Sequence, residues 1–159
     1  MTKTNVMRLL ETAGIEYTFK QYEYDESDLS GVHAAQELGI PEEQCFKTLV
    51  TKGDKTGYIV FCIPVAEELD LKKAASVSKN KKVEMLHVKD LLGLTGYIRG
   101  GCSPIGMKKK FPTFIDETAI LFNEIGVSAG QRGCQVMLSP EKLIEYVDAE
   151  TADLTVDNF

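Results

Sequence analysis

Short apolar segments follow one another along the whole chain, some with the spacing of a helix and others with the spacing of a strand. This pattern restricts the fold more than any other feature of the sequence. Val6, Leu9 and Leu10 recur at helical spacing, whereas residues 15–19 alternate as a half-buried strand does. Comparable short segments follow to the end of the chain, without a regular strand–helix–strand rhythm. The pattern predicts an α/β (α+β) fold in which a mixed sheet closes into a barrel-like structure with helices outside it.

Capping and turn residues set the expected limits of these elements. Ser30, Asp70 and Ser139 each precede a helical pattern and can accept hydrogen bonds from its first N–H groups, while Gly14 and Gly39 can end one. Helices are expected at about 5–13, 31–38, 71–77, 88–92 and 140–147. Strands are expected at about 15–19, 48–51, 58–63, 83–85, 96–98, 113–115, 120–122 and 134–137, with 48–51 and 58–63 forming a hairpin.

The size and composition of the chain favour one domain over residues 1–159. The chain has 159 residues, of which 43% are hydrophobic, enough for a single core, and it contains no repeat or linker-like segment. It lacks an apolar run long enough to cross a membrane and a signal-peptide pattern at its start. We therefore expect a cytoplasmic protein with no membrane partner.

The charge of the chain limits its nucleic-acid partners. A net charge of −6 argues against general binding of DNA or RNA, because phosphate affinity comes largely from lysine and arginine. Any contact with RNA must use a local basic patch. The candidates are Lys72, Lys73, Lys79, Lys81, Lys82, Arg99, Lys108, Lys109, Lys110 and Arg132, although such runs are usually simply solvated.

Several familiar catalytic arrangements are missing from the sequence. The only histidines, His33 and His87, lie outside any GxSxG or HExxH motif, and neither phosphate-binding glycine motif is present. Four cysteines are spaced too widely to form a CxxC pair and are expected to be reduced thiols. The sequence therefore predicts no metal and no cofactor, and any catalysis has to proceed without a triad.

Two glycine-rich segments, 96–106 and 126–133, are the most unusual parts of the chain. Glycine allows a backbone to approach a ligand closely, so that its N–H groups can point at a carbonyl or phosphate oxygen. A structural turn or bulge explains the same spacing equally well. A third candidate is Lys47, which lies at the start of an apolar strand pattern, a position where a lysine is ordinarily a solvated edge residue.

Four segments of the sequence resemble the YbaK/EbsC family. They are Phe46-Lys47-Thr48-Leu49-Val50, Pro64-Val65-Ala66 with Leu69-Asp70-Leu71-Lys72-Lys73, Gly96-Tyr97 through Gly100-Gly101-Cys102-Ser103-Pro104, and Val127-Ser128-Ala129-Gly130-Gln131-Arg132-Gly133. The resemblance runs in order from about Tyr22 to Leu154. It implies a free-standing relative of the bacterial prolyl-tRNA synthetase editing domain, with a mixed β-barrel flanked by helices, that deacylates cysteinyl-tRNA(Pro) and cysteinyl-tRNA(Cys).

The same resemblance implies a set of site residues. Lys47 matches the essential lysine of the family and is the predicted catalytic residue, while Gly100 and Pro104 match its GxxxP loop. Ser30 and Gln135 depart from the family pattern, which has phenylalanine and aspartate at these positions, so they bear on substrate choice. The predicted substrate-binding residues are Tyr22, Ser30, Thr48, Gly100, Gly101, Ser128 and Gln135.

The resemblance also implies a mechanism that uses the substrate itself. The thiol of the bound cysteine attacks its own carbonyl carbon and releases a cyclic thiolactone, so no protein nucleophile is needed. We expect the backbone N–H groups near Gly100 and Gly101 to bind the developing oxyanion and Lys47 to orient the terminal ribose or phosphate. The expected partners are the acceptor end of aminoacyl-tRNA and, in a transient complex, prolyl-tRNA synthetase.

Three alternatives stay open on the sequence. Ser30 and Gln135 allow editing of another misacylated tRNA, such as alanyl-tRNA(Pro). A non-catalytic module that binds tRNA or a synthetase would keep the same fold. A thiol enzyme could use Cys102, because the N–H groups of a Gly-Gly-Cys-Ser-Pro turn can lower the pKa of a thiol.

Overall fold

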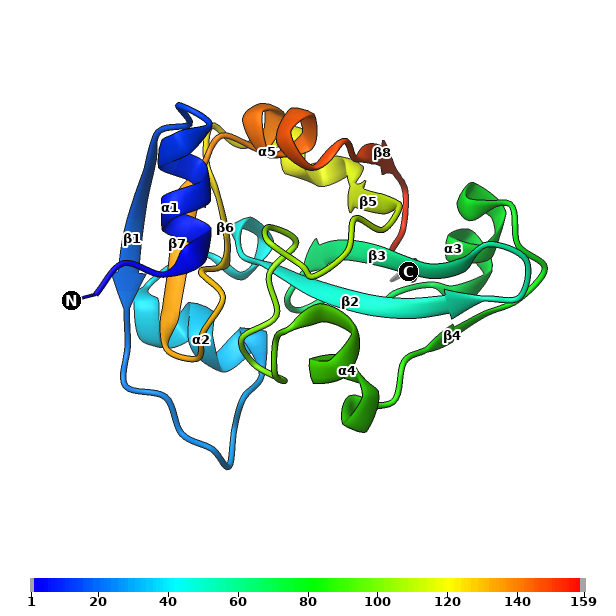
Figure 1. The fold of residues 1–159 in the computed structure, drawn as a ribbon, viewed down its shortest axis with the longest axis horizontal. Coiled ribbons are helices and arrows are strands. Elements are labelled where there is room, and N and C mark those ends of the chain that lie inside the picture. The colour runs from blue at the N-terminus through cyan, green and yellow to red at the C-terminus, as the bar shows by residue number, and fades with distance from the viewer. Residues whose placement is uncertain (1, 158–159) are drawn as a thin grey trace.

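Two β-sheets form the centre of the protein. The computed structural model describes residues 2–157. One sheet has the order β1 (Tyr17–Gln21), β7 (Cys134–Leu138) and β6 (Ile125–Ser128) and is antiparallel throughout. The other has the order β4 (Val83–Met85), β2 (Phe46–Gly53), β3 (Gly57–Pro64), β5 (Thr113–Asp116) and β8 (Glu150–Ala152). Because β3–β5 and β5–β8 are parallel pairs, the second sheet is mixed (Figure 1).

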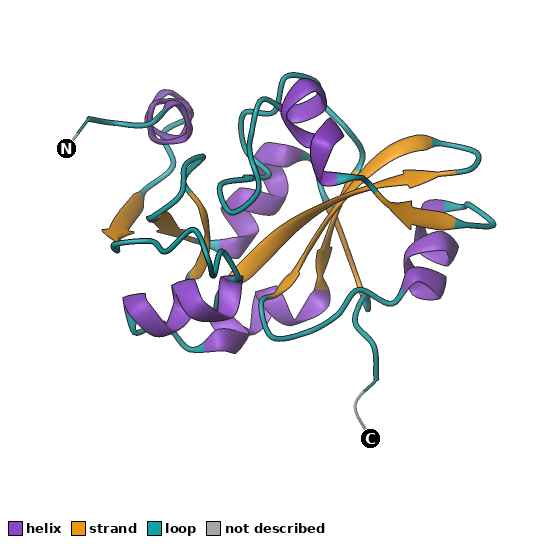
Figure 2. Cartoon of the chain, turned by 90° about the horizontal axis from the view of Figure 1, so that it is seen from below, coloured by secondary structure: helices purple, strands orange, loops and turns teal. Residues whose placement is uncertain are grey.

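Within residues 2–157, five α-helices lie around the sheets (Figure 2). The predicted caps are confirmed, since the side chains of Ser30, Asp70 and Ser139 each accept a hydrogen bond from the backbone of the following helix. Asp148 and Lys79 end two helices in the left-handed conformation. The helices are α1 (Asn5–Thr12), α2 (Gly31–Leu38), α3 (Leu71–Ser78), α4 (Val88–Thr95) and α5 (Pro140–Val147), and short 3₁₀ helices occupy Glu42–Gln44 and Glu117–Leu121.

The main apolar core lies between the two sheets and is covered by α1 and α5. Leu10 of α1, Phe46 of β2, Val136 of β7 and Leu143 of α5 are all buried in one cluster. Removing each such side chain from water contributes roughly 1.5–3 kcal/mol to stability. A second cluster fills the other face of the five-stranded sheet under α3, where the rings of Phe61 and Phe114 stack 5.5 Å apart. The core therefore holds the three-stranded sheet against the end of β2.

The mixed α/β class is confirmed, but the strands do not close into a barrel. Closure requires a continuous ladder around the sheet. Among the described residues, the two sheets meet at a single parallel bridge between Cys45 and Gly126, just before β2 begins, and the ladder does not continue along β2 and β6. Beyond that bridge β2 and β6 form no further pairs within residues 2–157, so a gap remains in the hydrogen-bonded ladder between the two sheets.

Two expected strands are absent from the structure, and two observed strands were not expected. Residues 96–98 are a turn and not a strand, because α4 continues to Thr95 and Gly96 ends it with a φ of +87°. Residues 120–122 are the end of a 3₁₀ helix, whose first turn is capped by Asp116. The strand of this region is β6, which overlaps the start of the second glycine-rich segment. Neither β6 nor β8 was predicted.

Candidate functional site

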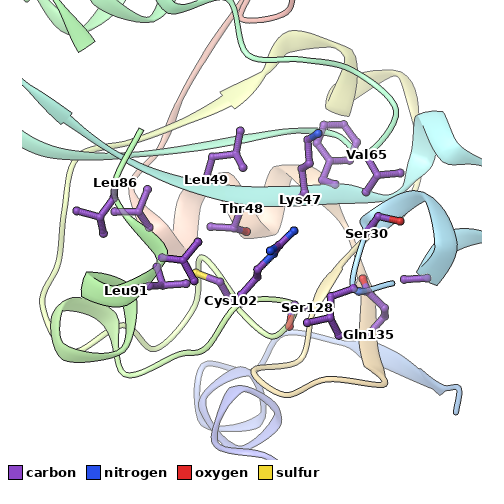
Figure 3. A pocket seen from close by; sticks show the side chains of 18 of the residues that line it. Ser30, Lys47, Thr48, Leu49, Val65, Leu86, Leu91, Cys102, Ser128 and Gln135 are labelled. Carbon is purple, nitrogen blue, oxygen red and sulfur yellow. The ribbon is translucent and has the colours of Figure 1, made fainter. Parts of the chain in front are cut away.

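A cavity of about 570 Å³ occupies the gap between the two sheets, within the range of pockets that hold small ligands. Figure 3 shows that side chains from both sheets and from α2 and α4 surround it. The lining residues are Tyr22, Leu29, Ser30, Gly31, Ala34, Phe46, Lys47, Thr48, Leu49, Val50, Val65, Met85, Leu86, Val88, Leu91, Arg99, Gly100, Cys102, Ser128 and Gln135. The place where the barrel fails to close is thus the place where a ligand can enter.

The structure brings nearly all of the predicted site residues to this one cavity. Those that line it are Tyr22, Ser30, Lys47, Thr48, Gly100, Ser128 and Gln135, which come from four separate parts of the chain. Gly101 is the exception, since it is buried and does not line the cavity. Its N–H donates to the carbonyl of Ile98 at 3.0 Å, so this amide is already used within the turn.

Gly101 instead allows two glycine-rich segments to pack against each other. A Cβ atom at this position would lie 3.1 Å from the backbone of Gln131. The Arg132 guanidinium holds the two segments together, because its Nε donates to the carbonyl of Arg99 at 2.9 Å. The neighbouring Gly100 has a φ of +86° and packs on Leu29. The role that we expected for the Gly101 N–H as an oxyanion donor is therefore not available in this geometry.

Lys47 is the half-buried cation of the site. It lies in β2 beside Val65, as Figure 3 shows. Partial burial lowers the pKa of its ammonium group, because removal from water disfavours the charged form, while the carboxylates of Glu68 and Glu67 act in the opposite direction. The strand position thus presents a partly desolvated cation, which interacts with an anionic ligand more strongly than a fully hydrated one does.

Thr48 follows Lys47 and leaves β2 on the opposite side, as strand alternation requires. Its hydroxyl group lies 3.8 Å from the sulfur of Cys62 on β3. Both Lys47 and Thr48 still line the cavity, together with Phe46, Leu49 and Val50. Five consecutive residues can do so only when the cavity runs along the edge of the strand and not over one face.

Ser128 and Gln135 form a buried polar wall on the three-stranded sheet. They face each other in the β6–β7 register and are 6% and 8% exposed. The Ser128 hydroxyl accepts from the N–H of Gly130 at 3.1 Å, and the Gln135 carbonyl oxygen lies 3.8 Å from the thiol of Cys45. Because the Ser128 oxygen is already an acceptor, its own hydrogen remains to be donated to a ligand.

The cavity also has an apolar wall that the sequence analysis did not predict. Met85, Leu86, Val88 and Leu91 form it, from the end of β4 and from α4. Val88 is 60% exposed and Met85 46% exposed, so this wall also faces solvent. No pattern in the sequence marked these residues as lining a site, because their position depends on where β4 and α4 pack.

The described residues offer no metal centre. Between residues 2 and 157, no group of three or more histidine, cysteine, aspartate or glutamate side chains is placed to hold an ion. In the same range, no helix has the length and apolarity needed to cross a membrane. The polar groups that do line the cavity are a lysine, an arginine, hydroxyl groups and an amide, which suit an oxygen-rich or phosphorylated ligand.

Cys102 lines the cavity but has the wrong environment for a nucleophile. Burial raises the pKa of its thiol to about 12, so the thiolate is scarce at neutral pH. In the deacylation that the family resemblance implies, we expect Cys102→Ala to lower the rate by less than about tenfold, because the removed thiol is not the nucleophile and its loss leaves a small cavity that costs only on the order of 1 kcal/mol of stability. Initial rates of cysteinyl-tRNA hydrolysis by the two proteins measure this. Complete loss of activity in a folded variant would restore the thiol-enzyme alternative.

Comparison with known proteins identifies the family. The model of the aminoacyl-tRNA editing domain family matches residues 29–146, which include most of the cavity. The chain is 52% identical to an Enterococcus faecalis protein provisionally named Cys-tRNA(Pro)/Cys-tRNA(Cys) deacylase EbsC, over 96% of this chain and 93% of that protein. The chain belongs to the aminoacyl-tRNA editing domain family. The resemblance to the YbaK/EbsC proteins is therefore confirmed.

Solved structures agree with this assignment. The crystal structure of a proposed trans-editing enzyme for prolyl-tRNA synthetase superposes with a TM-score of 0.82 at 26% identity, covering 99% of this chain and 100% of that one. Hypothetical protein APE2540 superposes with a TM-score of 0.85 at 20% identity, over 95% of this chain and 99% of that one, and supports the fold alone. This editing domain therefore has the mixed fold of its relatives over nearly its whole length.

Proposed function

We propose that this editing domain removes cysteine from cysteinyl-tRNA(Pro), and also from cysteinyl-tRNA(Cys), by cleaving the aminoacyl ester. The observation that carries the proposal is the assembly of Tyr22, Lys47, Thr48, Gly100 and Ser128 around one cavity. The family assignment and the 52% identity to a protein named for this activity support it. We further propose a cytoplasmic location, where aminoacyl-tRNA is used.

The chemistry suits a site without a protein nucleophile. An aminoacyl ester is already activated, so positioning and oxyanion stabilisation suffice to cleave it. In the step that we propose, the cysteine sulfur forms a bond to its own carbonyl carbon and the bond from that carbon to the ribose oxygen breaks. The thiol proton ends on the ribose hydroxyl, and a β-thiolactone leaves. The reaction consumes no oxidant and needs no cofactor.

Two cations at the cavity suit the terminal nucleotide of the tRNA. Lys47 is half-buried on β2, and Arg99 is exposed on the first glycine-rich segment, with its carbonyl held by Arg132. Arginine and lysine are the side chains that commonly bind phosphate oxygens. We assign to Lys47 the orientation of the terminal ribose or phosphate, and to Arg99 a contact with the phosphate backbone.

A synthetase supplies the remaining RNA affinity in this proposal. The chain carries a net charge of −6, which opposes extended contacts with the tRNA body. A transient complex with prolyl-tRNA synthetase would bring the acceptor end to the cavity. Co-sedimentation of the chain with prolyl-tRNA synthetase and tRNA(Pro) tests this part, and separate boundaries at micromolar concentrations of all three would contradict it.

The amino-acid preference is tested with a panel of substrates. We expect rapid loss of labelled cysteine from cysteinyl-tRNA(Pro), and turnover of alanyl- and prolyl-tRNA(Pro) lower by at least about 10²-fold, because neither substrate has a thiol that can attack its carbonyl. Turnover of alanine would instead favour the alanine-editing alternative. Ser30 and Gln135 would then be the residues to exchange first. Inactivity on all three substrates would favour a binding module.

A further inference from the structure

One edge of β2 is unpaired where it borders the cavity. On this side β4 pairs only with Thr51–Gly53, the last residues of the strand. The N–H of Leu86 donates to the carbonyl of Val50 at 3.0 Å, and this is the last hydrogen bond between β2 and the segment that follows β4. Within the part of the chain that the structure describes, residues before Val50 pair with no strand on this side until the isolated bridge at Cys45. A short stretch of sheet edge thus opens into the cavity.

The register shows which main-chain groups face the open edge. Peptide groups alternate between the two sides of a strand, and the Val50 carbonyl points toward Leu86 and away from β3. The N–H and C=O of Thr48, two residues earlier, therefore point the same way, whereas those of Lys47 and Leu49 pair with Ile63 and Phe61 of β3. Thr48 thus presents one main-chain donor and one acceptor to the cavity.

The other sheet does not occupy these groups. β6 is the strand that approaches this edge, at the bridge between Cys45 and Gly126, and the ladder stops there. Further along, Ser128 lies on the far wall of the cavity from Thr48 (Figure 3). The separation of the two sheets therefore exposes the Thr48 main chain to whatever enters the cavity.

We propose that the aminoacyl group of the substrate pairs with the main chain of Thr48 as a single residue of an antiparallel strand. The α-ammonium donates to the Thr48 carbonyl, and the Thr48 N–H donates to the ester carbonyl oxygen. An extended amino acid presents these two groups at the spacing with which hydrogen-bonded residues in a sheet exchange both bonds. This inference rests on the proposed function, because it names how that substrate is held.

The pairing places a donor at the reacting bond. Negative charge develops on the ester carbonyl oxygen when the substrate sulfur attacks, so the Thr48 N–H acts as an oxyanion donor. It supplies the interaction that the Gly101 N–H, already bonded to Ile98, does not. Because this pairing uses only main-chain groups, it does not itself distinguish cysteine from alanine. That discrimination comes from the substrate thiol and from the side-chain wall, where Ser30 and Gln135 lie.

An amide-to-ester exchange tests the donor without adding atoms to the cavity. Thr48→Val keeps the N–H, and placing 2-hydroxy-3-methylbutanoic acid at position 48 replaces that N–H with an oxygen in an otherwise identical side chain. We expect the ester form to deacylate cysteinyl-tRNA(Pro) about 10²-fold more slowly than Thr48→Val, mainly through kcat. The matched control is the corresponding ester at Ile59, whose N–H pairs with Thr51 inside the sheet. The ester at Ile59 should lower the melting temperature and leave the deacylation rate unchanged.

Equal rates for Thr48→Val and its ester form would overturn the inference while leaving the deacylase proposal intact. Inactivity of the wild type on all cysteinyl-tRNAs would instead remove the proposed function. If the ester form fails to fold, the amide proton of Thr48 in the ¹⁵N-labelled wild type serves as the probe. Cysteinyl-3′-amino-3′-deoxyadenosine, in which an amide replaces the ester, should move this resonance downfield, and an unmoved Thr48 signal at saturation would equally contradict the pairing.

Discussion

Lys47→Ala is expected to reduce cysteinyl-tRNA deacylation by roughly 10²–10³-fold, the cost of removing one well-placed electrostatic contact. Lys47 lies on the strand edge that lines the cavity, and partial burial strengthens its interaction with an anionic ligand. Single-turnover rates with cysteinyl-tRNA(Pro) provide the measurement. Retention of the full rate by a folded Lys47→Ala protein would end the assignment of Lys47 to the site.

A companion variant separates this loss from any effect on folding. Lys47→Met keeps the length of the side chain and removes its charge. The pKa of Lys47 is lowered from 10.5 by burial, so the folded state disfavours the charged form and the ammonium opposes folding at neutral pH. We therefore expect Lys47→Met to be as inactive as Lys47→Ala, with a melting temperature equal to or slightly above that of the wild type.

The pH dependence of stability has a definite sign. A lowered lysine pKa means that stability increases as the pH rises through the folded-state pKa toward 10.5, because the folded protein loses the proton before the unfolded chain does. The difference in melting temperature between Lys47→Met and the wild type should shrink over this range. A difference that grows with pH would show that the Lys47 charge stabilises the fold.

Much of the local structure could be predicted from the sequence because its causes are local. Ser30, Asp70 and Ser139 cap helices through hydrogen bonds that span only two or three residues. The hairpin of β2 and β3 likewise follows from two apolar runs and the turn residues between them. Such features require no knowledge of the rest of the chain.

The gap between the sheets could not be predicted, because it depends on contacts between distant segments. Whether β6 continues along β2 after the bridge at Cys45 and Gly126 is decided by packing across the core and not by the residues of either strand. β6 was missed as well, because it overlaps the glycine-rich segment 126–133 and glycine is common in turns.

The site was predicted in part, for a related reason. Motif residues such as Lys47 and Gly100 lie at the cavity, as the resemblance implied. A motif indicates which residues come together in the fold, but not their hydrogen bonds or orientation. The same motif did not show that the Gly101 N–H is used inside its own turn. Nor did any pattern indicate the apolar wall of Met85 and Leu91, whose membership depends on where α4 packs.

Gly133→Ala is expected to destabilise the protein by about 3 kcal/mol and to impair the site at the same time. Gly133 has a φ of +80°, where a side chain costs about 1–2 kcal/mol. A Cβ atom there would also lie 2.8 Å from the backbone carbonyl oxygen of Tyr22, and relieving such a contact typically costs about 1–3 kcal/mol more. The Tyr22 N–H donates to the Gly133 carbonyl, so a displacement of the backbone at Gly133 also displaces Tyr22, which lines the cavity.

Gly57→Ala supplies the matched control for this prediction. Gly57 has the same φ of +80°, but a Cβ atom there would meet no other atom within 4 Å. We expect it to cost only about 1 kcal/mol and to leave deacylation unchanged, because it lies in the hairpin turn far along β3 from the cavity. Urea unfolding and cysteinyl-tRNA hydrolysis compare the two variants. Equal losses of stability would show that backbone conformation alone requires glycine at 133, and that the close approach to Tyr22 has no energetic role.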